Sequence, residues 1–112
     1  MKHITVPLAF VCVLAYVGSV QAECCRVNLT LRYIVGSGTC ADAGGRRFSS
    51  SSCTVTVCAD GRPLVGTYCG RGSCNIFGCN CDGGCIKGDW QQSFLNNNRR
   101  QNIRVVDATW SS

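Results

Sequence analysis

The sequence predicts a small α+β domain in which an antiparallel β-sheet is covered by one α-helix and stabilised by disulfides. Three observations favour this fold: short segments with the alternation typical of strands, one segment with helical periodicity, and a loop region rich in glycine and cysteine. The helical segment follows the loop region, and strand patterns lie on either side of both. We find no internal repeat or linker, so we expect a single domain.

The N-terminal residues predict a signal peptide. A short cationic end, Met1-Lys2-His3, precedes an almost unbroken apolar stretch over residues 4–17. Val20-Gln21-Ala22 then supplies small residues at the positions that signal peptidase reads, so cleavage is expected after Ala22. A retained membrane anchor is the alternative, but the apolar stretch is short for a bilayer. We therefore expect residues 1–22 to be removed and residues 23–112 to be secreted, without stable membrane association.

The cysteines fit an oxidising, extracellular compartment. The chain has 11 cysteines, and loss of the signal peptide removes Cys12 and leaves an even number. An even number in a small secreted domain predicts disulfides throughout, with a connectivity that the sequence leaves open. Zinc binding by Cys79, Cys81 and Cys85 is the alternative, but the paired two-residue gaps of zinc motifs are missing, so we expect no metal and no cofactor. The cysteines expected to form disulfides are Cys24, Cys25, Cys40, Cys53, Cys58, Cys69, Cys74, Cys79, Cys81 and Cys85.

Three strands are expected before the loop region. Residues 26–35 alternate as a half-buried strand does, and residues 53–58 are rich in β-branched side chains. Asp60-Gly61 is a tight-turn signal, after which residues 63–68 are expected to return as a third strand. Residues 36–52 lack periodicity and predict a long loop. The expected apolar side of the first strand consists of Val27, Leu29, Leu31, Tyr33 and Val35.

One helix and a last strand are expected near the C-terminus. Asp89 is expected to cap the helix, and Gln92, three residues later, to complete a capping box. Arg99-Arg100 would suit the C-terminal end of its dipole. Residues 103–110 show a less regular strand pattern. The apolar face of the helix consists of Trp90, Phe94 and Leu95.

The cysteine-rich segments carry a family resemblance. They include Gly72-Ser-Cys-Asn-Ile-Phe-Gly-Cys-Asn-Cys-Asp-Gly-Gly-Cys85, followed by Gly88-Asp89-Trp90 and Phe94, together with Glu23-Cys24-Cys25, Cys58-Ala-Asp-Gly61 and Tyr68-Cys69-Gly70. In these segments, and in the order of all ten cysteines, the chain closely resembles the Diedel family of small secreted insect proteins. The resemblance covers nearly the whole of residues 23–112.

The resemblance implies a function in innate immunity. It implies a haemolymph protein, induced during immune challenge, that acts like a cytokine and restrains an insect immune signalling pathway; insect viruses carry relatives. It also implies a disulfide-clamped domain of sheet and helix, in agreement with the periodicity. No binding residue is carried over from the family.

The composition of the secreted part argues against two other classes of protein. The only histidine is His3, so the usual general base is missing after cleavage and we do not expect an enzyme. Without Lys2 the formal net charge falls from +5 to +4, too little and too scattered to suggest nucleic acid as a partner.

The best candidate for a partner contact is Ile76-Phe77. These two large apolar residues lie in the cross-linked loop, where they would form a rigid knob, although they could instead cover the core. Trp110, in a tail expected to be loose, is a candidate exposed anchor, whereas Trp90 and Phe94 are expected in the core.

Two further motifs allow alternative interpretations. Asn28-Leu29-Thr30 is a glycosylation sequon on the polar side of the first strand, close to Cys25. Arg46-Arg47 is either a processing site, part of a basic patch with Arg26 and Arg32, or, as we favour, a solvated loop.

We therefore expect a secreted, monomeric immune modulator that binds an extracellular or cell-surface protein. The alternative is a direct defence effector: an antimicrobial protein, or a protease inhibitor whose extended binding loop would be residues 36–52.

Overall fold

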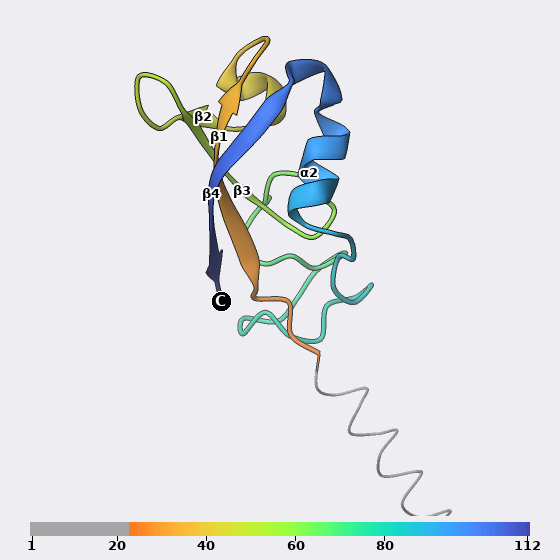
Figure 1. The fold of residues 1–112 in the computed structure, drawn as a ribbon. Coiled ribbons are helices and arrows are strands. Elements are labelled where there is room, and N and C mark those ends of the chain that lie inside the picture. Colours follow the sequence, from red (N-terminus) through yellow and green to blue (C-terminus); the bar gives the residue numbers. More distant parts are fainter. Residues whose placement is uncertain (1–22) are drawn as a thin grey trace, which may run out of the picture.

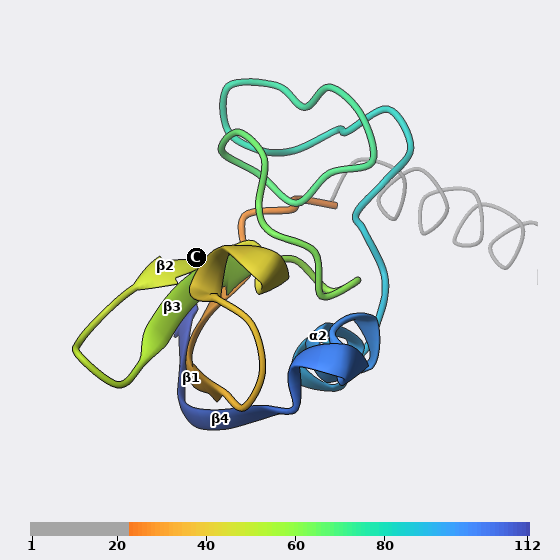
Figure 2. The ribbon, with the colours of Figure 1, turned by 90° about the horizontal axis from the view of Figure 1, so that it is seen from above.

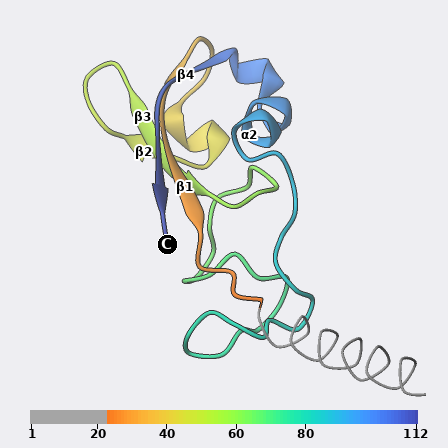
Figure 3. The same ribbon diagram turned by 60° about the horizontal axis from the view of Figure 1, so that its bottom comes forward.

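The structure, a computed structural model, describes residues 23–112 (Figure 1). The signal-peptide prediction concerns residues 1–22 and lies outside them. In the described part of the chain, no helix has the length and apolar character needed to cross a membrane. The fold is α+β as predicted: a twisted antiparallel sheet with a short helix on one face, and a cysteine-rich loop region at one end of both (Figures 1 and 3).

Four strands form one antiparallel sheet in the order β2-β3-β1-β4. Three of them are the strands expected at residues 26–35, 53–58 and 103–110. The fourth is a two-residue edge strand inside the segment predicted to be a long loop. The strands are β1 (Asn28–Val35), β2 (Arg46–Arg47), β3 (Cys53–Val57) and β4 (Ile103–Ser111).

Strand β1 lies in the middle of the sheet and supplies much of the core. Leu29, Leu31 and Tyr33 are almost completely buried, as the alternation predicted. Val27 was expected in the same row but lies before the strand begins and is 44% exposed. On the opposite, outer face, the hydroxyls of Thr30 and Thr56 are 2.9 Å apart and share a hydrogen bond.

The prediction of a strand at residues 63–68 is wrong. Pro63 forms only an isolated bridge with Val57, and the Leu64 N–H donates to Thr56 O at 2.9 Å. The chain then leaves the sheet: Val65 is 88% exposed and Gly66 has a φ of +78°. Proline lacks the N–H that a ladder needs, and a positive φ interrupts an extended strand, so the pairing ends almost where it begins. The remaining edge of β3 is paired by β2 instead.

The helix α2 (Gln91–Asn97) covers the inner face of the sheet (Figures 1 and 2). Phe94 is fully buried and its ring meets that of Tyr33 edge-on, with centroids 5.1 Å apart. The predicted turn at Asp60-Gly61 is confirmed and packs against the helix: the Asn97 amide donates to Asp60 O at 2.9 Å. Gly61 is required there because a Cβ would collide with the backbone of Phe94.

The predicted capping box is not formed. The residue that precedes the helix is Trp90, whose φ of +49° costs about 1–3 kcal/mol for a side chain of this kind. The Asp89 N–H donates to Ser93 Oγ at 2.9 Å, and the Gln92 side chain donates forward to Asn96 at 3.0 Å rather than back. Arg99-Arg100 lies beyond the helix in a short 3₁₀ turn, so these cations do not end α2 as predicted.

A single apolar core joins the sheet and the helix. Its buried members come from β1, β3 and α2, with Ala43 from the 3₁₀ turn Cys40–Ala43. Trp90 and Leu95 are half-buried at its border, so the apolar helix face is confirmed. The buried members are Leu29, Leu31, Tyr33, Ala43, Cys53, Val55, Val57 and Phe94.

The C-terminal residues form a strand rather than the loose tail that was expected. Trp110 is paired with Leu29 in the sheet. Its ring meets that of Trp90 edge-to-face, with centroids 4.9 Å apart. It is still 57% exposed because β4 is an edge strand. A bulge at Val106 shifts the register, since Val105 faces Tyr33 while Asp107 faces Arg32.

We expect the free energy of unfolding to decrease above pH 10. Burial raises the pKa of the Tyr33 hydroxyl above its ordinary value of 10.0, against a smaller opposing effect of a hydrogen bond with backbone Gly45. The unfolded chain therefore releases this proton first. The contribution of Tyr33 is complete below pH 10.0 and is lost as the pH rises through the folded pKa.

Urea unfolding of the wild-type protein and Tyr33→Phe, measured over this range, checks the expectation. The free energy of unfolding of the variant should be lower by about 1 kcal/mol at neutral pH. The variant lacks the hydrogen bond that the Tyr33 hydroxyl donates to Cys40 O at 2.9 Å. It should also lose the alkaline decline, and an identical decline in both proteins would contradict the assignment.

Candidate partner-binding loop

All ten cysteines predicted to be oxidised are paired, in five disulfides. The neighbours Cys24 and Cys25 have different partners, as expected for side chains that point to opposite sides of an extended chain. One disulfide ties the 3₁₀ turn to the start of β3, and the other four hold the loop region. The pairs are Cys24–Cys79, Cys25–Cys85, Cys40–Cys53, Cys58–Cys69 and Cys74–Cys81.

The loop region is also bonded to the N-terminal segment through its backbone. The Cys25 N–H donates to Gly78 O at 2.7 Å, and the Cys69 N–H donates to Cys25 O at 2.9 Å. Gly70 lies against the Cys74–Cys81 disulfide so closely that a Cβ would meet both sulfur atoms. Covalent and backbone bonds thus order a segment with almost no apolar interior.

Ile76 and Phe77 occupy the tip of a tight turn formed by residues 75–78. The Gly78 N–H closes the turn by donating to Asn75 O at 2.9 Å. The Asn75 side-chain oxygen accepts two further hydrogen bonds, from the N–H of Phe77 at 3.0 Å and of Cys79 at 2.9 Å. From outside the turn, the Tyr68 hydroxyl donates to Ile76 O at 2.7 Å. We call residues 75–78 the Ile76–Phe77 turn.

The Ile76–Phe77 turn presents its apolar side chains to solvent. Ile76 is 82% exposed and Phe77 64%, so neither covers the core, which was the alternative interpretation of these residues. Flanking disulfides at Cys74 and Cys79 fix both ends of the turn. The sequence left both interpretations of Ile76 and Phe77 open, and it did not indicate the support from Asn75 and Tyr68.

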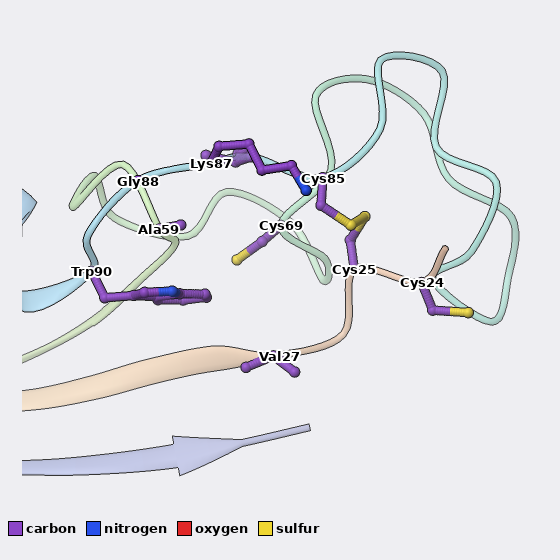
Figure 4. Close-up of a pocket in the computed structure, with 10 residues that line it drawn as sticks. Cys24, Cys25, Val27, Ala59, Cys69, Cys85, Lys87, Gly88 and Trp90 are labelled. Atoms are coloured by element: carbon purple, nitrogen blue, oxygen red, sulfur yellow. A yellow bond between two sulfur atoms is a disulfide. The ribbon is translucent and has the colours of Figure 1, made fainter. Parts of the chain in front are cut away.

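A small cleft lies where the loop region meets the sheet and helix (Figure 4). It has a volume of about 270 Å³ and is walled by the Trp90 indole, Val27 and the Cys25–Cys85 disulfide. These groups come from two segments far apart in sequence, residues 25–27 and 85–90. The sequence predicted none of this cleft, because the connectivity that brings Cys85 to Cys25 was open.

Glu23 and Lys87 form an ion pair near this cleft, with Nζ and Oε1 3.5 Å apart. The Cys85 N–H donates to the same Glu23 oxygen at 3.1 Å. This hydrogen bond, followed by the charge of Lys87, lowers the pKa of Glu23 below its ordinary value. Glu23 also lies within 4.8 Å of the Cys25 and Cys85 sulfur atoms, but these are bonded to one another and offer no thiolate to a metal.

The sequon asparagine, Asn28, is the first residue of β1 and lies opposite Ser111 on the outer face of the sheet. Its side chain is partly exposed, and no helix formed by residues 23–112 covers this face (Figure 2). The sequon hydroxyl, on Thr30, is bonded to Thr56 in the folded protein. A glycan at Asn28 would therefore extend over the uncovered outer face.

Arg46-Arg47, for which processing was one interpretation, forms β2 and is paired with Thr54 and Cys53 of β3. A protease would have to separate this pairing before it could bind the segment in an extended form. Arg46 shares the outer face with Arg32, whose guanidinium lies 5.0 Å from the centroid of the Phe48 ring. The two arginines are thus near one another, but β2 remains a solvated edge.

The fold and the loop together define a small disulfide-cross-linked α+β domain with an apolar turn exposed at one end.

Comparison with known proteins agrees with the resemblance seen in the sequence. The family model described as Diedel matches residues 24–99. Protein Diedel of Drosophila melanogaster is 42% identical over 102 residues, which cover 91% of this chain and 89% of that protein. The crystal structure of the CG11501 protein has a TM-score of 0.76 and 42% identity, covering 79% of this chain and 95% of that one. The chain belongs to the Diedel family.

Replacing Asn75 by alanine should loosen the Ile76–Phe77 turn without unfolding the domain. Its side chain accepts the hydrogen bonds from Phe77 and Cys79, and each is worth about 1 kcal/mol. We expect the amide protons of these two residues to exchange about fivefold faster with solvent. NMR hydrogen exchange measures this directly. Ser73→Ala is the control, since that hydroxyl makes no hydrogen bond to residues 23–112; equal rates in both variants would contradict the support assigned to Asn75.

Protein secreted from insect cells should carry one N-glycan at Asn28. Its intact mass should decrease by one glycan after enzymatic deglycosylation or in Asn28→Gln. Thr30→Ser is the matched control because it preserves both the sequon and the hydroxyl that meets Thr56. Wild-type protein with the mass of the bare polypeptide would show that the site is not used.

Proposed function

We propose that this protein is a secreted, cytokine-like modulator that restrains an insect innate immune signalling pathway by binding an extracellular protein. Membership of the Diedel family supports an immune role, and the disulfide framework supports secretion into the haemolymph. The proposal concerns recognition rather than catalysis. Its partner is an extracellular or cell-surface protein, and neither nucleic acid nor membrane is part of it.

The observation that carries the proposal is the exposure of Ile76 and Phe77 on a rigid turn. Large apolar side chains exposed side by side are unusual on a surface unless they meet a partner. The turn is already ordered by Asn75, Tyr68 and two disulfides, so binding would lose little conformational entropy. An aromatic side chain inserted into a partner pocket is a common source of binding energy.

A protease inhibitor is less well supported by the geometry. The segment that would supply an extended inhibitory loop, residues 36–52, contains the 3₁₀ turn Cys40–Ala43 and strand β2. The Cys40–Cys53 disulfide closes it against the core. It therefore does not present the exposed, extended backbone that such an inhibitor inserts into an active site.

Phe77→Ala should abolish activity while leaving the fold intact. We expect the half-maximal concentration to rise about 30-fold or more, in line with removal of an aromatic hot spot. The measurement is suppression of an immune-signalling reporter in insect cells, together with cross-linking of the labelled protein to its surface partner. The melting temperature should be unchanged, because Phe77 is 64% exposed and outside the core.

Val65→Ala is the control, since Val65 is 88% exposed but lies outside the turn. Full activity of Phe77→Ala, or an equal loss in both variants, would contradict the proposed contact. Bacterial killing or protease inhibition by the wild-type protein would instead favour a direct effector.

A further inference from the structure

Strand β4 is a long, open edge of the sheet. It pairs with β1 along one side, and among residues 23–112 no strand pairs with the other (Figure 1). Its nine residues contrast with the two arginines of β2 at the opposite edge. Short, charged edge strands resist pairing with other chains, whereas a long edge is a template for it. The two edges thus differ in their capacity to bind another strand.

The bulge at Val106 places two opposite charges of β4 on the same face of the sheet. Arg104 lies opposite Ile34 and Asp107 opposite Arg32, so both project from the outer face although they are three residues apart. In a regular strand this spacing would place them on opposite faces. The bulge therefore gives the outer face of the edge one positive and one negative side chain, separated by the two valines Val105 and Val106.

Neither charge is used within the described domain. The ion pair found among residues 23–112 is Lys87–Glu23, and neither Arg104 nor Asp107 makes a side-chain hydrogen bond there. The cross-strand neighbour of Asp107 is Arg32, whose guanidinium lies over the Phe48 ring instead. Arg104 faces an apolar neighbour, Ile34. Both groups remain available to an approaching strand.

We propose that β4 pairs antiparallel with β4 of a second copy of this chain, about a two-fold axis between Val105 and Val106. In this register Arg104 of each copy faces Asp107 of the other, and Val105 faces Val106 across the axis. Since both copies carry the same bulge, the spacing of the charges matches. Two charges of the same sign at positions 104 and 107 would repel one another in this register. This edge is self-complementary.

Such an interface is small, so we expect a weak dimer that depends on concentration. Sedimentation equilibrium from about 1 μM to about 1 mM should show the mass rising from one chain towards two. Arg104→Asp and Asp107→Arg should each weaken the dimer by at least about tenfold, because each places two like-charged pairs across the axis. An equimolar mixture of the two variants should restore it, since every cross-axis pair is again of opposite sign.

Arg99→Asp is the matched control: it changes the charge equally but lies in the 3₁₀ turn outside β4, and should dimerise like the wild type. Thermal melts establish that each variant is folded. A wild-type protein that stays monomeric throughout, as the sequence alone led us to expect, would overturn the proposal. So would a dimer that is indifferent to both charge reversals, or variants that are not rescued by mixing. No receptor enters the assay, so its outcome is independent of the Ile76–Phe77 contact.

Discussion

The attachment of two consecutive cysteines, Cys24 and Cys25, to separate points of the loop region is the constraint on which the structure depends. Strand β1 begins three residues later, at Asn28, so the positions of Cys79 and Cys85 are fixed relative to the centre of the sheet. Within residues 63–88 only Cys69 and Gly78 are buried, and the hydrophobic effect alone would not order such a segment. Each cross-link contributes about 2–4 kcal/mol by restricting the unfolded chain.

Two kinds of stabilisation are therefore separated in space. The sheet and α2 rely on a packed apolar core around Tyr33 and Phe94, whereas the loop region relies on covalent bonds and backbone hydrogen bonds. This separation is what allows Ile76 and Phe77 to be exposed: the fold does not need to bury them. A loop held together by burial could not present its largest apolar residues to solvent and remain ordered.

Sequence patterns predicted the elements that are decided by burial. The alternation of β1 and the helical spacing of the face with Phe94 are visible in the sequence, because each side chain's environment repeats with the period of its element. Strand β3 was visible from its β-branched residues. The helix cap and the third strand failed because they depend on single local geometries, such as the φ of Trp90 or the missing N–H of Pro63. Strand β2 is too short to show any period. Neither the disulfide connectivity nor the cleft beside Trp90 is encoded locally, since both arise when distant segments meet.

The edge-to-face contact between Trp90 and Trp110 joins the start of α2 to the end of β4, beside the Cys25–Cys85 and Cys58–Cys69 disulfides. These are the two tryptophans of the whole chain. All of its indole fluorescence thus originates at the junction between the packed half and the cross-linked half. Disulfides quench indole emission at short range. The tryptophan fluorescence intensity of the native protein therefore reports whether that junction is closed and its cysteines are oxidised.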